Sequence, residues 1–142
     1  RMYAIKKQQE KQIEWLSKQH GSYREIKQDD FFNIVVRDKG GSEDVVVHFY
    51  HADFERCKIM DSKLQDLAPM HMAAKYVKVD VQKAPFLVDK LKVTMLPCVV
   101  LFHNDVAVDR IVGFDDLGNV DDFPLELLRE RIEVGLSGEE LQ

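Results

Sequence analysis

The chain has 142 residues, of which 45% are hydrophobic and 32% are charged, and its formal net charge at pH 7 is -5. This size allows one domain with a true core and one appended element, and the composition excludes a mainly disordered chain. Two cysteines are too few for a secreted disulfide scaffold, and no apolar run approaches the ~18 residues that cross a bilayer. We therefore expect no membrane association and a cytoplasmic location, with which nuclear presence is also compatible. Because the sequence starts at Arg1 rather than at methionine, we expect a fragment of a longer protein.

The charge is segregated along the chain. Residues 1–28 hold seven Lys/Arg and three Glu, whereas the part from Asp105 onward holds eleven acids and three arginines. An acidic globular part argues against nucleic acid as a partner and favours a basic or amphipathic protein surface. The alternative is that the charges serve solubility alone.

The first segment, RMYAIKKQQEKQIEWLSKQH, lacks Gly and Pro and predicts a helix. Its apolar stripe is thin, so we expect the helix to pack only at its Trp15/Leu16 end and to project elsewhere, or to complete an interface with a partner. A short helix over DDFFNIVVRDKGG is expected next, with Asp29 or Asp30 as its N-cap and Gly40 near its end.

From Val45 onward, strand and helix patterns alternate. The runs VVVHFY, KYVKVDV, PCVVLF and AVDRIVGF predict four strands, with a tight reversal at HNDV between the last two. A helix follows the first strand and is limited by Pro69, KAPFLVDKL predicts a short helix with Pro85 in its first turn, and DDFPLELLRERIEVGL predicts an amphipathic final helix. The order is β-α-β-α-β-β-α, preceded by one or two helices.

This order is that of a thioredoxin-like α/β fold, a central mixed sheet flanked by helices, here with an N-terminal helical extension. We divide the chain into a helix and linker (1–28), the thioredoxin-like domain (29–136) and the start of a C-terminal tail (137–142). Pro97 resembles the cis-proline that faces the active-site turn of thioredoxins, and Lys78 and Gly113 resemble a lysine and a glycine of that family.

The redox chemistry of thioredoxins does not follow from this frame. Aligned on VVVHFYHADFERCK, the attacking cysteine is replaced by Phe54, and Cys57 takes the resolving position. Dithiol exchange needs a thiolate that attacks and a second thiol that resolves the mixed disulfide. His48 also replaces the buried aspartate of the parent family. We therefore expect no enzymatic activity and no cofactor, with Phe54, Cys57 and Pro97 as a vestigial redox site.

The motifs HGSYREI, HFYHADFERCKIMD and above all VGFDDLGNVDDF resemble those of the phosducin-like proteins. The resemblance implies a cytosolic cofactor of the chaperonin that folds actin and tubulin, which binds the chaperonin and its clients without turning over a substrate. Phosducin itself binds G-protein βγ through a long N-terminal helical region. This chain has only a short helix there, so the resemblance does not extend to βγ binding.

The cysteines and histidines have competing interpretations. Cys57 is a small buried hydrophobe or, in the alternative, the single cysteine of a thiol redox protein, for which peroxiredoxins offer the comparison. A Cys57–Cys98 disulfide is not expected in a reducing compartment. His48 and His51 lack the spacing of a zinc site, because a strand sends residues three apart to opposite faces.

Candidate binding residues lie at two places. Phe54 is an exposed binding anchor or a plug in the former active-site cleft. In the run GFDDLGNVDDF, Gly118 and Asn119 predict a turn, and Asp121 or Asp122 is expected to cap the last helix. We expect the face built from four aspartates to contribute to partner capture: Asp115, Asp116, Asp121 and Asp122.

Overall fold

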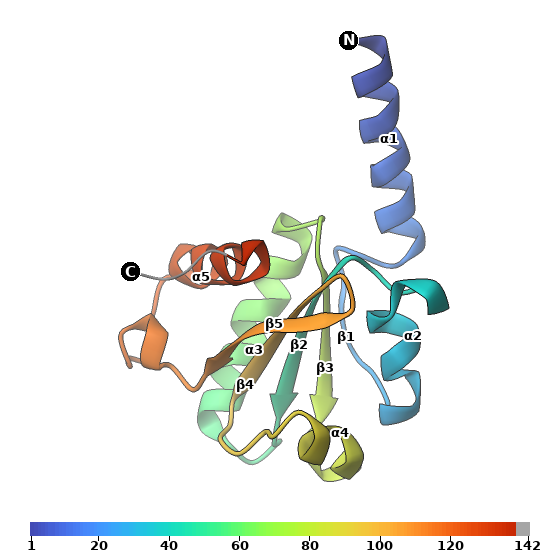
Figure 1. The fold of residues 1–142 in the computed structure, drawn as a ribbon. Coiled ribbons are helices and arrows are strands. Elements are labelled where there is room, and N and C mark those ends of the chain that lie inside the picture. The colour runs from blue at the N-terminus through green and yellow to red at the C-terminus, as the bar shows by residue number, and fades with distance from the viewer. Residues whose placement is uncertain (139–142) are drawn as a thin grey trace.

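The computed structural model describes residues 1–138. Of the predicted tail, residues 139–142 lie outside the described residues. The described chain forms a five-stranded mixed sheet with helices on both faces (Figure 1). In chain order, its helices and strands are α1 (Met2–Ser17), β1 (Tyr23–Glu25), α2 (Phe31–Val35), β2 (Asp44–Tyr50), α3 (Glu55–Leu67), β3 (Lys75–Asp80), α4 (Pro85–Lys90), β4 (Cys98–His103), β5 (Val106–Val112) and α5 (Leu125–Ser137).

The strand order is β1-β3-β2-β4-β5. Strands β1, β3 and β2 run parallel, whereas β4 runs antiparallel to both β2 and β5. Their arrangement confirms the predicted thioredoxin-like fold, including the reversal between β4 and β5, where Asn104 and Asp105 both have positive φ values of 49° and 73°. Two consecutive left-handed residues match the twist of a tight hairpin.

The central strand β2 is buried on both faces, as its continuous β-branched run predicts. Val46 packs into a core beneath α3 and α5, whereas Val45, Val47 and Phe49 pack into a second core beneath α2 and α4. The alternation of side chains along one strand thus supplies both cores.

Strand β1 was missed by the sequence prediction, which found four strands. It pairs in parallel with β3 through Tyr23↔Tyr76 and Glu25↔Lys78. Three residues are too few to show a strand period, and β1 forms because β3 offers it backbone partners. As an edge strand it brings Tyr23 beside the interior of the domain.

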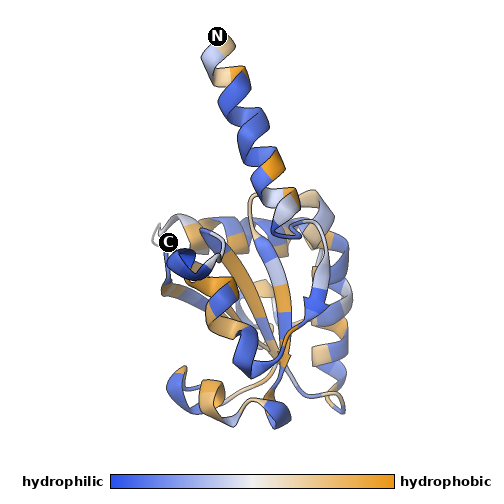
Figure 2. Ribbon diagram, turned by 90° about the vertical axis from the view of Figure 1, so that its right-hand side faces the viewer, coloured by the Kyte–Doolittle hydropathy of each residue, from blue (hydrophilic) through white to orange (hydrophobic). Residues whose placement is uncertain are grey.

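Helix α1 projects away from the domain, as Figure 1 shows, and in Figure 2 its ribbon is mostly hydrophilic with isolated apolar positions. None of its sixteen residues is buried against the described part of the chain. Trp15 is half-buried and stacks on His20, with ring centroids 6.2 Å apart, which agrees with the predicted docking end. The packing expected for Leu16 was wrong, because this side chain is 63% exposed.

The start of α2 agrees with the sequence prediction, whereas the start of α5 does not. Asp30 is the N-cap residue of α2, yet its side chain makes no capping hydrogen bond within residues 1–138. Neither Asp121 nor Asp122 caps α5, whose N-cap is Pro124 with extended backbone angles. Phe123 is buried, and Pro124 starts this helix two to three residues later than the aspartates suggested.

Candidate functional site

The turn between β2 and α3 carries Phe54 as the N-cap residue of α3. Its side chain is 47% exposed, and its ring stacks on His51 with centroids 4.8 Å apart. The Phe54 carbonyl accepts a hydrogen bond from the Cys57 amide at 3.1 Å. Phe54 therefore lies on the surface of the turn and does not fill a cleft as a plug would.

Both cysteines are buried free thiols, at 2% exposure each. Burial is the main reason that the pKa of Cys57 lies above its usual value, and burial likewise raises the pKa of Cys98. A thiol of raised pKa holds little of the reactive thiolate at neutral pH. Cys57 thus has the environment of a core residue, one helical turn behind a phenylalanine that has no sulfur.

The cis-proline expected at Pro97 is present, since the Leu96–Pro97 peptide bond is cis. The Pro97 carbonyl accepts a hydrogen bond from the Gly113 amide at 2.8 Å, so the loop before β4 is joined to the end of β5. Gly113 has a positive φ of 57° and follows the last residue of β5. The backbone frame of a thioredoxin site is complete, although its nucleophile is missing.

A polar cluster lies behind this turn. His48 is fully buried, its Nδ1 lies 2.8 Å from the Tyr23 hydroxyl, and its Nε2 is the buried side-chain atom left without a hydrogen-bond partner among residues 1–138. Burial lowers the pKa of His48 to about 3, so the ring is neutral at pH 7. A neutral imidazole cannot replace the carboxylate of thioredoxins as a negative charge.

Lys78 completes the cluster by joining three strands and a helix. Its Nζ lies 3.1 Å from Asp61 Oδ1 on α3 and 5.4 Å from the ring centroids of both Tyr23 and Tyr50. The lysine is thus neutralised by a carboxylate and flanked by two aromatic faces, an arrangement that holds the charge in place. Both contacts join Lys78 to neighbouring elements of the fold.

Arg56 connects the turn to the acidic loop 114–123. Its Nε donates to Asp121 at 3.1 Å, its Nη1 donates to the Asn119 side chain at 2.8 Å, and its guanidinium lies 4.7 Å from the Phe114 ring centroid. Several contacts from one planar group fix the loop more firmly than a single surface ion pair would. Arg56 therefore links the turn that carries Phe54 to the acidic loop.

The four aspartates of the predicted binding face divide into two pairs. Asp121 binds Arg56, and Asp116 lies 3.0 Å from the buried Arg131, so both carboxylates hold the fold together. Asp115 and Asp122 are exposed and form no hydrogen bond or ion pair through their side chains with any part of the chain that the structure describes. The charges available to a partner on this face are therefore those of Asp115 and Asp122.

The sequence prediction did not identify three residues of this site: Arg56, Asp61 and Tyr23. Arg56 and Asp121 are 65 positions apart, and no local spacing predicts such a pair. The turn predicted at Gly118 and Asn119 is confirmed by their φ values of 86° and 55°, and it places the Asn119 amide within reach of Arg56.

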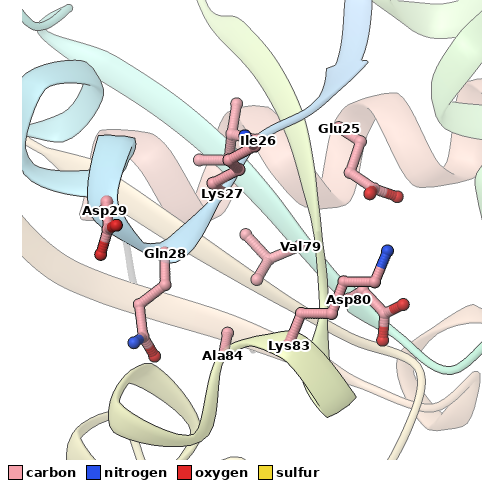
Figure 3. Close-up of a pocket in the computed structure, with 9 residues that line it drawn as sticks. All are labelled: Glu25, Ile26, Lys27, Gln28, Asp29, Val79, Asp80, Lys83 and Ala84. Atoms are coloured by element: carbon pink, nitrogen blue, oxygen red, sulfur yellow. The ribbon is translucent and has the colours of Figure 1, made fainter.

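A hollow of about 310 Å³ lies between the C-terminal ends of β1 and β3 (Figure 3). Glu25, Asp29 and Asp80 line it together with Lys27 and Lys83, so its charges are mixed. Within residues 1–138, no three His, Cys, Asp or Glu side chains converge as metal ligands would. No helix in the same range is long and apolar enough to cross a membrane.

A wall of this hollow is built by Gln28. Its side-chain oxygen accepts hydrogen bonds from the Phe86 and Leu87 amides at 2.8 and 3.2 Å, at the start of α4. These amides have no partner within the helix itself, so Gln28 acts as their cap from a distant segment. The residue is therefore part of the scaffold that joins the segment after β1 to α4.

Comparison with known proteins agrees with this geometry. The thioredoxin family profile matches residues 22–123. Spinach chloroplast thioredoxin F in its long form superposes with a TM-score of 0.67 at 22% identity, over 89% of this chain and 93% of the thioredoxin. At that identity, the likeness concerns the fold.

Curated relatives are more similar in sequence. Thioredoxin domain-containing protein PLP3A of Arabidopsis thaliana is 51% identical over 87% of this chain and 52% of its own length. Phosducin-like protein 3 of Dictyostelium discoideum is 44% identical over 93% and 69%, and mouse thioredoxin domain-containing protein 9 is 45% identical over 93% and 57%. The chain thus spans about half to two thirds of the length of these relatives. It belongs to the thioredoxin family and, within it, to the phosducin-like proteins that carry the names phosducin-like protein 3 and thioredoxin domain-containing protein 9.

Proposed function

We propose that the chain is a non-catalytic thioredoxin-fold co-chaperone, which binds the cytosolic chaperonin in the cytoplasm and modulates the folding of actin and tubulin. The absence of catalysis in this proposal is supported by one observation: the exposed Phe54 stands in the position of the attacking cysteine, and the Cys57 thiol is buried one turn behind it. The chaperonin part rests on the resemblance to phosducin-like proteins.

The surface proposed for this contact combines an apolar and an acidic part. Phe54 and Val120 each expose 47% of their surface, and Arg56 holds the loop that carries Val120 against the turn that carries Phe54. The unpaired carboxylates of Asp115 and Asp122 lie in the same loop. Aromatic anchors contribute most to the stability of a complex, whereas exposed charges mainly steer its formation.

Capture of the chaperonin tests the proposal. The immobilised chain should retain the chaperonin from cytosol, and Phe54→Ala should reduce that retention by accelerating dissociation. Asp115→Asn combined with Asp122→Asn should lower the association rate and its salt dependence, since surface charges act over roughly 8 Å at physiological ionic strength. Asp38→Asn combined with Asp66→Asn removes two exposed acids outside the loop and serves as the matched control.

A thiol assay separates this function from the single-cysteine redox alternative. In the folded protein at neutral pH, we expect slow alkylation of Cys57, because burial hides the thiol and raises its pKa. Rapid alkylation of Cys57, together with no chaperonin in the eluate, would favour the redox protein instead.

A further inference from the structure

Helix α1 carries one apolar stripe that the described residues leave uncovered. At 100° per residue, its members fall within an arc of about 80° on the helix. They are the apolar residues Met2, Ile5, Ile13 and Leu16 and, at the centre, the polar Gln9. Met2, Ile13 and Leu16 expose 81%, 67% and 63% of their surface, and Ile5 exposes 45%. A helix of sixteen residues is marginal alone in water, and its apolar face gains stability when another surface covers it.

The base of α1 is fixed, so the direction of the stripe is fixed as well. Trp15 stacks on His20, Lys18 Nζ donates to the Gly41 carbonyl at 2.8 Å, and the Lys18 carbonyl accepts a hydrogen bond from Lys75. Figure 1 shows the rest of the helix extending away from the sheet and its covering helices. The stripe is therefore presented to other molecules.

The spacing within the stripe is the same from both ends. Successive members are three, four, four and three residues apart, with Gln9 at the centre. An antiparallel helix of the same sequence, with Gln9 opposite Gln9, places Met2 opposite Leu16 and Ile5 opposite Ile13. An interface around a two-fold axis requires such self-complementarity. We propose that α1 pairs antiparallel with α1 of a second copy of this chain, centred on Gln9.

The polar residues beside the stripe favour the antiparallel direction. Lys6 and Glu10 lie on one flank, and Gln8 and Gln12 lie on the other. A two-fold axis perpendicular to both helices sets each flank against the same flank of the second copy, so Lys6 meets Glu10 twice and the glutamines meet each other. A parallel pair would set the charged flank against the glutamines and align the two helix dipoles unfavourably.

The shape of the molecule allows this pairing. A sixteen-residue helix is about 24 Å long, and the two domains would lie at opposite ends of the pair because each is attached at the C-terminal end of α1. Ile5, Gln8, Gln9, Gln12 and Ile13 line a shallow open hollow along the helix, which the second helix would occupy. The interface is small, so the association is weak and depends on concentration.

Sedimentation equilibrium of this chain, at concentrations up to about 1 mM as a weak interface requires, tests the pairing. We expect a monomer–dimer equilibrium whose Kd rises at least tenfold in the variant Ile5→Gln/Ile13→Gln. Glutamine is a good helix former, so circular dichroism should show that α1 persists. Tyr3→Gln is the matched control, because Tyr3 is 76% exposed on α1 but about 120° from the centre of the stripe, and it should leave the Kd unchanged.

Cross-linking tests the direction. A mixture of Ile5→Cys chains and size-tagged Ile13→Cys chains should form mixed disulfide dimers, whereas Ile5→Cys alone should form none, and the parent gives the background from its buried cysteines. A strictly monomeric parent, a dimer that survives Ile5→Gln/Ile13→Gln, or efficient cross-linking of Ile5→Cys with itself would each overturn the proposal. So would a monomeric chain whose stripe variant loses capture of the chaperonin, since the chaperonin would then cover the stripe.

Discussion

The buried His48 makes a measurable prediction about acid stability. Burial lowers the pKa of this histidine to about 3 from an ordinary value of 6.5. The unfolded chain therefore binds one more proton than the folded chain between these two pH values. The contribution of the buried neutral His48 to the free energy of unfolding is complete above about pH 6.5 and falls as the pH drops towards 3. Applied to the two pKa values, the linkage relation gives a loss of about 3 kcal/mol between pH 7 and pH 4.5.

Guanidinium unfolding followed by circular dichroism at pH 7 and at pH 4.5 measures this loss. His48→Phe removes the titrating group, so the decrease in the free energy of unfolding on acidification should be about 3 kcal/mol smaller than in the parent. The comparison between variant and parent is needed because burial also lowers the pKa of His20 and His71, which destabilises the fold in the same direction.

Tyr23→Phe is the control, because it removes the hydroxyl beside His48 but leaves the half-buried ring in place. This variant should lose about 1–3 kcal/mol of stability through the missing hydrogen bond, yet keep the pH dependence of the parent. If His48→Phe and the parent lose the same free energy on acidification, the assignment of the effect to His48 burial is refuted.

Three further changes probe packing, the first helix and the redox turn. Gly135→Ala should lower the free energy of unfolding by about 1–3 kcal/mol through overpacking, because its new methyl group would lie 2.8 Å from an aspartate oxygen on β5. Removing residues 1–12 should leave the domain folded with its melting temperature nearly unchanged, since Trp15 remains docked. Phe54→Cys should form a reversible disulfide with Cys57, yet reduce insulin far more slowly than a thioredoxin, and the parent should show no dithiol activity.

Each of these expectations has a contrary outcome. An unchanged melting temperature for Gly135→Ala would mean that α5 can move away from β5. Glu130→Ala, on the exposed face of α5, is the control variant. A large loss of thermal stability on truncation would show that α1 contributes to the core. Robust insulin reduction by the parent would refute the binding function, and failure of Phe54→Cys to form a disulfide would refute the alignment of the turn.

The elements with a strong period could be predicted from the sequence. The β-branched run of β2, the alternation in β3 and the amphipathic pattern of α5 each reflect burial that one segment expresses by itself. Strand β1 could not be predicted, because its three residues become a strand only through pairing with β3. The start of α5 was misplaced because aspartates near a helix start suggest a cap, whereas Pro124 sets the entry geometry.

The candidate site was predictable in its chemistry but not in its contacts. Loss of the attacking cysteine at Phe54 and the cis bond at Pro97 follow from alignment to a fold. The division of the aspartates into bonded and unpaired carboxylates depends on Arg56 and Arg131, which reach them across the tertiary structure. Neither arginine stands at a spacing that a local pattern would connect to the loop.

The bridge made by Arg56 has a consequence for how the surface responds to its partners. The guanidinium extends from the first turn of α3, and the loop that it holds carries Asn119 and Asp121. A partner that binds the Asp121 carboxylate therefore competes with Arg56 for it, and the cation it displaces belongs to a residue two positions after Phe54. By thermodynamic reciprocity, a ligand of the turn that recruits Arg56 and a partner of the acidic loop would change each other's binding free energy by the same amount. The side chain that links the turn to the acidic loop thus also couples binding at one of them to the affinity of the other.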